Sequence, residues 1–157
     1  KNLYKFAGGY LFNDNSSLTS GGLDGELVKE VVARTLSLSR VSASEIVAIK
    51  AHGTGTKDND LSEGLGLLKV FGEKLPPVVS LKGALGHALG AAGAMETAVW
   101  LSCLEKGVIP KSFGFSQMDE EIGFAPSQEN NVACNGAYLC TFFGFGATCS
   151  SYLIIKE

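Results

Sequence analysis

The sequence of 157 residues lacks paired cysteines and clustered positive charge. No CxxC pair marks a zinc site, and the spacing is too irregular for a disulfide scaffold, so we expect buried free thiols at Cys103, Cys134, Cys140 and Cys149. Thirteen basic residues are scattered among sixteen acidic ones. Because phosphate binding needs concentrated positive charge, a nucleic-acid surface is excluded.

A membrane-spanning run and a signal peptide are also missing from the sequence. The longest weakly polar run, residues 88–104, contains Glu96 and two glycines and is shorter than the roughly 20 residues that a membrane span needs. No N-terminal stretch has the charged, apolar and small-residue order of a signal peptide. We therefore expect a cytoplasmic protein without a membrane span.

Apolar residues make up 45% of the chain and charged residues 18%, which is typical of one globular domain. The first half predicts a strand over 3–12, a polar turn over 13–22 and an amphipathic helix from Asp24. Ser42 and Glu45 match a capping box ahead of the apolar segment 46–49.

The second half predicts a helix over 60–71, a short strand over 78–81 and a helix from His87 to about Leu104. Because that last helix is apolar on nearly every side, it is expected to be a layer covered by two sheets. The chain from Val108 onward reads as β-rich and closes with a hairpin of segments 137–143 and 150–155. These elements indicate an α/β fold.

Three glycine-rich segments at expected strand ends are candidate site loops: 52–56, 82–93 and 143–149. They contain both histidines of the chain, which makes a functional role more attractive than a purely structural one. A metal site with Asp60 or Glu63 is disfavoured because no histidine spacing supports it. Neither a phosphate loop, a GxGxxG fingerprint nor a GxSxG nucleophile motif is present.

The loops form an ordered motif set: His52-Gly-Thr-Gly-Thr56 with Asn59-Asp60 and Glu63 behind it, Ser80-Leu-Lys82 with Gly86-His87 and Gly90-Ala-Ala-Gly93, and Gly144-Phe-Gly146. This set resembles the C-terminal half of β-ketoacyl-acyl-carrier-protein synthases, elongating condensing enzymes of the thiolase-like superfamily. The resemblance runs from about residue 3 to 155. It implies that 1–157 is the synthase C-terminal domain, a mixed sheet with helices on its faces and one half of an αβαβα sandwich.

The resemblance implies a decarboxylating Claisen condensation of an acyl thioester with malonyl-acyl carrier protein, without a bound cofactor or metal. His52 and His87 would donate hydrogen bonds to the thioester oxygen, for which both must be neutral. A helix N-terminus and the cation of Lys82 would both disfavour a charged His87. Lys82 and Glu96 would form an ion pair that supports His87, although a mostly structural pair is an alternative.

Other residues match family positions for substrate binding and gating. Thr54 and Thr56 match residues that bind the phosphopantetheine arm, although a pure turn role is also open. Phe145 matches a gating phenylalanine, with Gly144 and Gly146 lining the same loop. Phe142 and Phe143 are expected to be core aromatics. The family usually continues Gly-Phe-Gly-Gly-Thr-Asn, and the departure here leaves open the hydrogen bonds of the asparagine.

The family's nucleophilic cysteine belongs to an N-terminal half that this chain does not contain, and none of the four cysteines replaces it by motif. The implied partners are that half, acyl carrier protein and a second synthase subunit in a homodimer or heterodimer. Two other readings stay open: a non-catalytic, chain-length-factor-like subunit, which retention of both histidines disfavours, and a self-standing small binding domain.

Overall fold

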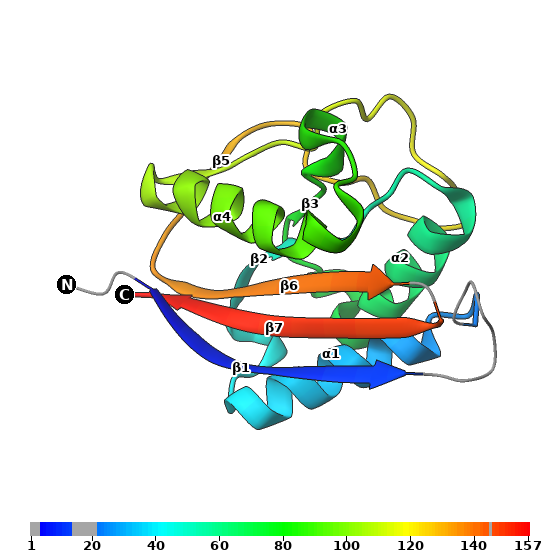
Figure 1. Ribbon diagram of the computed structural model, residues 1–157, viewed down its shortest axis with the longest axis horizontal. Coiled ribbons are helices and arrows are strands. Elements are labelled where there is room, and N and C mark those ends of the chain that lie inside the picture. Colours follow the sequence, from blue (N-terminus) through cyan, green and yellow to red (C-terminus); the bar gives the residue numbers. More distant parts are fainter. Residues whose placement is uncertain (1–3, 14–21, 145) are drawn as a thin grey trace.

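Five strands form one mixed sheet in the order β1-β7-β6-β2-β3 in a computed structural model, which describes residues 4–13, 22–144 and 146–157. Antiparallel pairing joins β1 (Tyr4–Asn13), β7 (Thr148–Lys156) and β6 (Gly136–Gly144), which run side by side in Figure 1. Parallel pairing joins β6 to β2 (Ile46–Lys50) and β2 to β3 (Val78–Val79). The short strands β4 (Val108–Ile109) and β5 (Asn131–Val132) pair separately. The predicted mixed sheet is confirmed.

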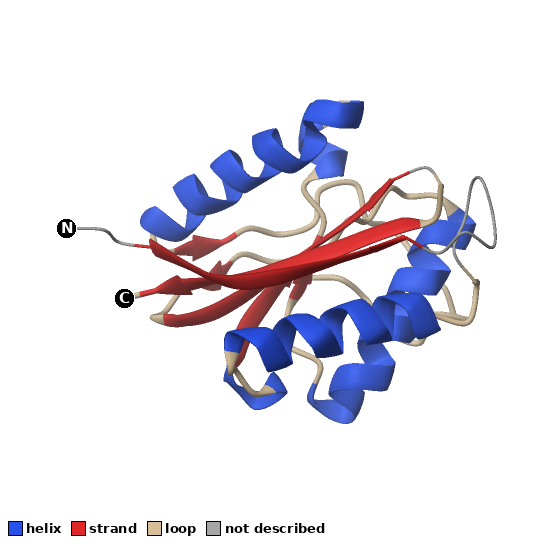
Figure 2. Ribbon diagram, turned by 60° about the horizontal axis from the view of Figure 1, so that its bottom comes forward, coloured by secondary structure: helices blue, strands red, loops and turns tan. Residues whose placement is uncertain are grey.

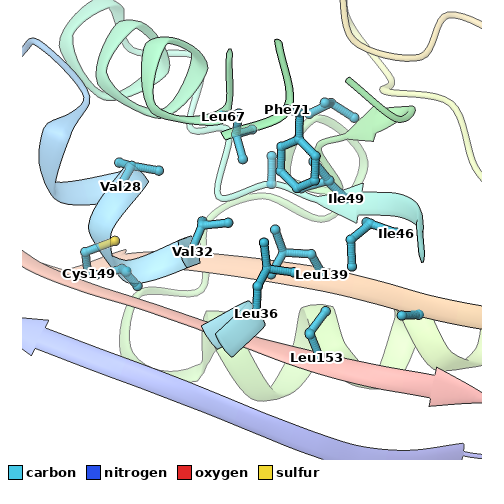
Figure 3. Close-up of a cluster of buried hydrophobic side chains, with 14 residues drawn as sticks. Val28, Val32, Leu36, Ile46, Ile49, Leu67, Phe71, Leu139, Cys149 and Leu153 are labelled. Atoms are coloured by element: carbon cyan, nitrogen blue, oxygen red, sulfur yellow. The ribbon is translucent and has the colours of Figure 1, made fainter. Parts of the chain in front are cut away.

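Helices α1 (Glu26–Ser39) and α2 (Lys57–Phe71) cover one face of the large sheet (Figure 2). Helical spacing aligns the buried side chains of α1 on one stripe, and these side chains pack against the sheet and α2. The resulting cluster, shown in Figure 3, includes Val28, Val32, Leu36, Leu67, Phe71, Ile46, Ile49, Leu139, Cys149 and Leu153. Full burial of each large aliphatic side chain contributes about 1.5–3 kcal/mol. The amphipathic helix predicted from Asp24 is therefore confirmed.

Helix α4 (Ala92–Glu105) covers the opposite face. Every fourth residue is buried, namely Ala92, Glu96, Trp100 and Leu104, while Ala94 and Ala98 on the other side are exposed. The prediction of one helix over 87–104 is wrong. A short α3 (Lys82–Leu85) ends at Gly86 (φ 73°), and a single 3-10 turn, η3 (Leu89–Ala91), then precedes α4, because Leu89 adopts a left-handed backbone with φ 49°.

Most other predicted elements are confirmed, with shifted ends. The strand over 3–12, the closing hairpin and the capping box at η1 (Ala43–Glu45) are present. Helix α2 begins at Lys57, three residues early, and ends before the 3-10 turn η2 (Gly72–Lys74). The strand over 78–81 stops at Val79, and 110–130 contains no helix or strand.

The predicted polar turn falls largely on residues 14–21, outside the described part. Across the described ranges, no helix has the length and apolarity needed to cross a membrane.

Candidate active site

Three loops meet at one edge of the sheet because β2, β3 and β6 are mutually parallel. Carboxyl ends of parallel strands lie at the same edge, which is where α/β sheets commonly build sites. His52 follows β2, Lys82 follows β3, and Gly144 ends β6. All three glycine-rich segments therefore start at this edge, and His87 reaches it from the loop between α3 and η3.

The two imidazoles lie beside each other. Their ring centroids are 5.6 Å apart and the rings are nearly perpendicular, at 84°. His52 is only 4% exposed, whereas His87 is exposed and lines a cleft of about 710 Å³. The expected convergence of the two histidines is thus seen, with His87 at the cleft and His52 behind it.

Hydrogen bonds select the same neutral tautomer in both rings. Lys82 Nζ lies 3.3 Å from His52 Nδ1, and the backbone N–H of Leu89 donates to His87 Nδ1 at 3.1 Å. Both partners can only donate, so each Nδ1 acts as an acceptor and carries no proton. Each Nε2 then carries the hydrogen and can donate it to a ligand.

The surroundings of His52 keep its imidazole neutral. Burial lowers the pKa of His52 to about 3, and the nearby cations of Lys82 and Lys50, followed by His87, act in the same direction. Desolvation and positive neighbours both disfavour an imidazolium.

Glu96 is shared by two lysines beneath this ring. Its Oε1 lies 2.7 Å from Lys82 Nζ and its Oε2 accepts a hydrogen bond from Lys50 Nζ at 2.6 Å, with Glu96 itself 0% exposed. Lys82 also donates to the backbone carbonyl oxygen of His52 at 2.5 Å. The buried Lys82–Glu96 pair is confirmed, but the histidine that Lys82 contacts is His52 and not His87, since its ammonium points back toward the end of β2.

Glu63 fixes the backbone at the start of the His52 loop. Its two carboxylate oxygens accept the N–H groups of His52 and Gly53, each at 2.8 Å, and Oε1 also accepts the hydroxyl of Thr141. Burial raises the pKa of Glu63, and these three hydrogen bonds oppose the rise. From the position directly after β3, the Ser80 hydroxyl donates to the Gly53 carbonyl at 2.6 Å. The turn that carries His52 is therefore held from both sides.

The cleft is bordered by the 52–64 segment, by Ser80–Gly83 and by the irregular segment 112–126. Thr54 lines it, whereas Thr56 does not and is exposed. The two hydroxyl oxygens are 2.7 Å apart, and Asn59 donates to that of Thr54 at 3.3 Å. Of the two predicted arm-binding threonines, only Thr54 faces the cleft.

Phe145 lies outside the described residues, so its predicted gating position is untested. Gly144 ends β6, and Gly146 follows in a turn with φ 78°. The ring of Phe143 is 5.2 Å from that of His52, while Phe142 stacks on Tyr152 and has Lys50 Nζ 3.6 Å from its ring centre. Both are half-buried, and Phe143 also contacts the site, beyond its expected role in the core.

All four cysteines are free thiols, but only two are buried. Burial raises the pKa of Cys140 to about 12 and also raises that of Cys149. Cys103 is half-buried and Cys134 is exposed, which corrects the expectation of four buried thiols, because Cys134 precedes β6 at the sheet edge opposite the histidines. Across the described ranges, no group of three His, Cys, Asp or Glu could hold a metal.

Sequence reasoning missed two site residues, Lys50 and the backbone-binding Glu63. Lys50 is the one charged residue in the strand Ile-Val-Ala-Ile-Lys, whose other residues are buried or half-buried. A charge at the end of such a strand needs a buried partner, so the sequence alone could have indicated that Lys50 forms an ion pair. Glu63 was named as part of a motif and as a disfavoured metal ligand, but its role was missed, since its partners are backbone N–H groups ten and eleven residues away.

Comparison with known proteins gives one consistent family. Residues 5–116 match the family described as "Beta-ketoacyl synthase, C-terminal domain". The chain is 31% identical over 120 residues, 76% of its length, to 3-oxoacyl-[acyl-carrier-protein] synthase 2 of Mycobacterium bovis. It covers 29% of that relative and thus spans well under half of the curated relatives it matches.

Solved structures agree with this assignment. One is a type II polyketide synthase acyl-carrier protein in complex with its ketosynthase bound to the hexaketide, with TM-score 0.92 and 25% identity over 99% of this chain and 39% of that one. Another is a ketosynthase in complex with its chain length factor from Xenorhabdus doucetiae, with TM-score 0.86 and 25% identity over 100% of this chain and 40% of that one.

Proposed function

This chain belongs to the β-ketoacyl synthase family as its C-terminal domain, and from that premise we propose that it supplies the two histidines and the gating loop for a decarboxylating Claisen condensation. The observation that carries the proposal is the pair of neighbouring imidazoles whose Nδ1 atoms are both occupied by donors. Two Nε2–H donors beside a cleft fit one thioester oxygen on which negative charge develops.

In the proposed reaction, the bond between the malonyl carboxylate and the α-carbon breaks and carbon dioxide leaves. The electron pair moves into an enolate whose oxygen accepts hydrogen bonds from His52 and His87. The enolate carbon then attacks an acyl thioester, and the thiolate leaves to give the 3-oxoacyl product. A neutral imidazole stabilises the enolate oxygen by a hydrogen bond and keeps its proton. An imidazolium could instead transfer its proton to the enolate, so neutral donors serve this step better.

Substrate arrives in this proposal as a thioester on the phosphopantetheine arm of acyl carrier protein, and no bound cofactor is used. Thr54, which lines the cleft, holds the arm, and Thr56 orients Thr54 through their hydroxyl contact. The complex of a related ketosynthase with its acyl-carrier protein supports such a partner. A second synthase subunit completes the enzyme, and a reducing cytoplasm suits the free thiols.

We further propose that the acyl-carrying cysteine lies in the synthase's N-terminal half. A thiolate is the nucleophile, and raised pKa values disfavour it at Cys103, Cys140 and Cys149. Cys134 is exposed but lies before β6, at the opposite end of the strand from the histidines. None of the four is placed to carry the acyl group.

A non-catalytic subunit of the chain-length-factor type is the second candidate, favoured by the similarity to a ketosynthase that assembles with such a factor. The two proposals differ in what the histidines do. In a non-catalytic subunit the Nε2–H donors would have no reacting oxygen, and replacing them would leave turnover unchanged.

The deciding experiment incubates the chain with acyl-acyl carrier protein, reads intact masses, and repeats this after adding the N-terminal half of the synthase. We expect an acyl adduct only on the added half, and carbon dioxide release from malonyl-acyl carrier protein only in the combined sample. An adduct on any of the four cysteines of this chain would overturn the assignment. Release that is equally fast with His52→Ala and His87→Ala would support the non-catalytic alternative.

A further inference from the structure

Lys50 is an ionisable side chain at the end of a central strand, and it is 0% exposed. Its ammonium has two partners: Glu96 Oε2 at 2.6 Å and the face of Phe142, 3.6 Å from the ring centre. Burial lowers the pKa of Lys50, and its attraction to Glu96 opposes this. An unpaired buried charge costs several kcal/mol, so the ion pair is what keeps this lysine in place.

Lys50 and Lys82 contact different carboxylate oxygens of Glu96. Lys50 takes Oε2 and Lys82 takes Oε1. The ammonium of Lys82 has three hydrogens, and its three neighbours are Glu96 Oε1, the carbonyl of His52 and His52 Nδ1. Among the described residues Glu96 Oε1 accepts no hydrogen bond, so it attracts Lys82 by charge alone, and Oε2 is held by Lys50. The hydrogen that Lys82 directs at His52 Nδ1 therefore has no competing acceptor on this carboxylate.

The same arrangement leaves two ammonium groups against one carboxylate beneath His52. Ionisable groups reach this cluster from every element packed around it: Lys50 on β2, Lys82 on α3, Glu96 on α4, Glu63 and Asp60 on α2, Cys140 on β6, Tyr152 on β7, and His87. Glu63 is committed to backbone N–H groups and Thr141. The lysines whose charges act on the His52 ring are Lys82 and Lys50, and both lower the pKa of its imidazole.

We propose that Lys50 is a positioning residue of the histidine site: by holding Glu96 Oε2, it keeps Lys82 donating to His52 Nδ1 and so keeps His52 a neutral Nε2–H donor. The inference deepens the proposed function, on which its catalytic consequence rests. Its structural part, the tautomer and protonation of His52, can be measured on this chain without any reaction.

Replacing Lys50 by an uncharged residue has two expected effects. The cluster loses its positive excess, so His52 accepts a proton more readily. Removing one unit charge at this range moves a midpoint by about 1–2 pH units. Glu96 Oε2 is also released to compete for a Lys82 hydrogen, which weakens the donor to Nδ1 and mixes the two tautomers.

The test is a nitrogen-resolved NMR titration of the imidazoles in the chain, which has only two histidines. The variants are Lys50→Met, Glu96→Gln and the double variant, with the exposed Lys74→Met as the matched charge control and His87→Gln for assignment. We expect Lys50→Met to raise the His52 midpoint by about 1–2 pH units and Glu96→Gln to lower it. The double variant restores the excess of one positive charge and should return toward the original midpoint, and Lys74→Met should leave it unchanged.

A folded Lys50→Met chain whose His52 nitrogen shifts and titration match those of the unaltered chain would overturn the proposal. If Lys50→Met does not fold, Lys50→Gln, which can still donate to Glu96 but has no charge, is judged by the same midpoint. The rate of malonyl decarboxylation by a synthase containing this chain distinguishes the positioning role of Lys50 from the proposed catalytic role of the histidines. If the His52 midpoint changes and the acid limb of the pH–rate profile moves to higher pH, both roles are supported. If the midpoint changes but the rate does not, the positioning role stands and the proposed catalysis is overturned.

Discussion

The two histidines of the site are held as hydrogen-bond donors by different means. His52 is buried and takes its Nδ1 partner from Lys82, while His87 is exposed and takes its partner from the backbone of Leu89. A side-chain donor is adjustable by mutation, whereas a backbone donor two residues away depends only on the local turn. Each histidine should therefore respond to a different kind of change.

The first prediction concerns stability and follows from the low pKa of His52, about 3 against 6.5 when unfolded. Below pH 6.5 the unfolded chain binds a proton that the folded chain refuses, so the free energy of unfolding falls as pH decreases toward 3. At pH 5 the loss is about 2 kcal/mol relative to pH 7.5. Urea unfolding of the chain and of His52→Gln at both pH values measures it.

The expected result is a smaller pH dependence in His52→Gln, by about that amount, because glutamine does not titrate. The raised pKa of Glu63 gives a contribution of opposite sign that both proteins share. Equal pH dependence in the two proteins would show that His52 titrates normally in the folded state.

The second prediction separates half-reactions at His87, which lines the cleft. In the assembled synthase, His87→Ala should slow malonyl decarboxylation by about 10²- to 10³-fold, the usual effect of removing one oxyanion donor. Acylation of the cysteine, which creates no enolate, should change much less. Carbon dioxide release and intact-mass acylation are measured in parallel. Equal losses in both would point to a general disturbance of the site.

At the scale of elements, regular periodicity made helices and strands predictable, and local backbone geometry set their ends. The hairpin of β6 and β7 followed from two apolar runs around a glycine-rich turn. The break between α3 and α4 did not, because it depends on Leu89 in a left-handed conformation, which an apolar run of this kind does not announce. Helix α2 begins at Lys57 because the chain turns directly after Thr56, ahead of the first apolar position.

The third prediction tests the close contact of α1 and α2. A Cβ at Gly66 would lie 2.4 Å from the Cβ of Val28 and 2.7 Å from the carbonyl oxygen of Gly25. Gly66→Ala should therefore lower the free energy of unfolding by about 1–3 kcal/mol, even though alanine favours a helix. Gly90→Ala is the matched control, since a Cβ there meets nothing within 4 Å. Denaturant unfolding of both variants decides, and equal stability would mean that the helices separate at no cost.

At the scale of the whole molecule, the edge that carries the candidate site was predictable in outline because glycine-rich loops follow parallel strands. The partners of the two buried lysines, Lys82 and Lys50, were not predictable. Which histidine Lys82 contacts depends on the depth of its ammonium relative to β2, and the role of Lys50 depends on α4 crossing that strand with Glu96 inward. Such contacts join residues 30 and 46 positions apart in the chain, and spacing alone does not define them.

The last prediction concerns the outward face of α4, expected from the sequence to need a second layer. Ala92 and Leu104 are in fact buried against the sheet, and Ala88, Met95 and Val99 are half-buried. Over residues 89–98 the exposed surface consists of Leu89, which is 72% exposed, Gly90 and a row of small residues at Ala91, Ala94 and Ala98; farther along α4, Ser102 and Glu105 are exposed. The part of this surface over residues 89–98 is apolar and exposes no charge, and such a surface favours association when no other layer covers it.

We therefore expect the isolated chain to self-associate through α4 at micromolar concentrations, as measured by sedimentation equilibrium. Introducing two charges, Ala94→Glu with Ala98→Glu, should shift it toward monomer, because association would then desolvate both carboxylates without partners. Leu38→Glu is the control, since it adds one charge at an exposed apolar side chain of α1, on the other face of the sheet. Adding the N-terminal half of the synthase should displace the self-association in the unaltered chain but bind the doubly charged variant poorly. If Leu38→Glu dissociates the chain and the α4 variant does not, the associating surface lies on the α1 side of the sheet.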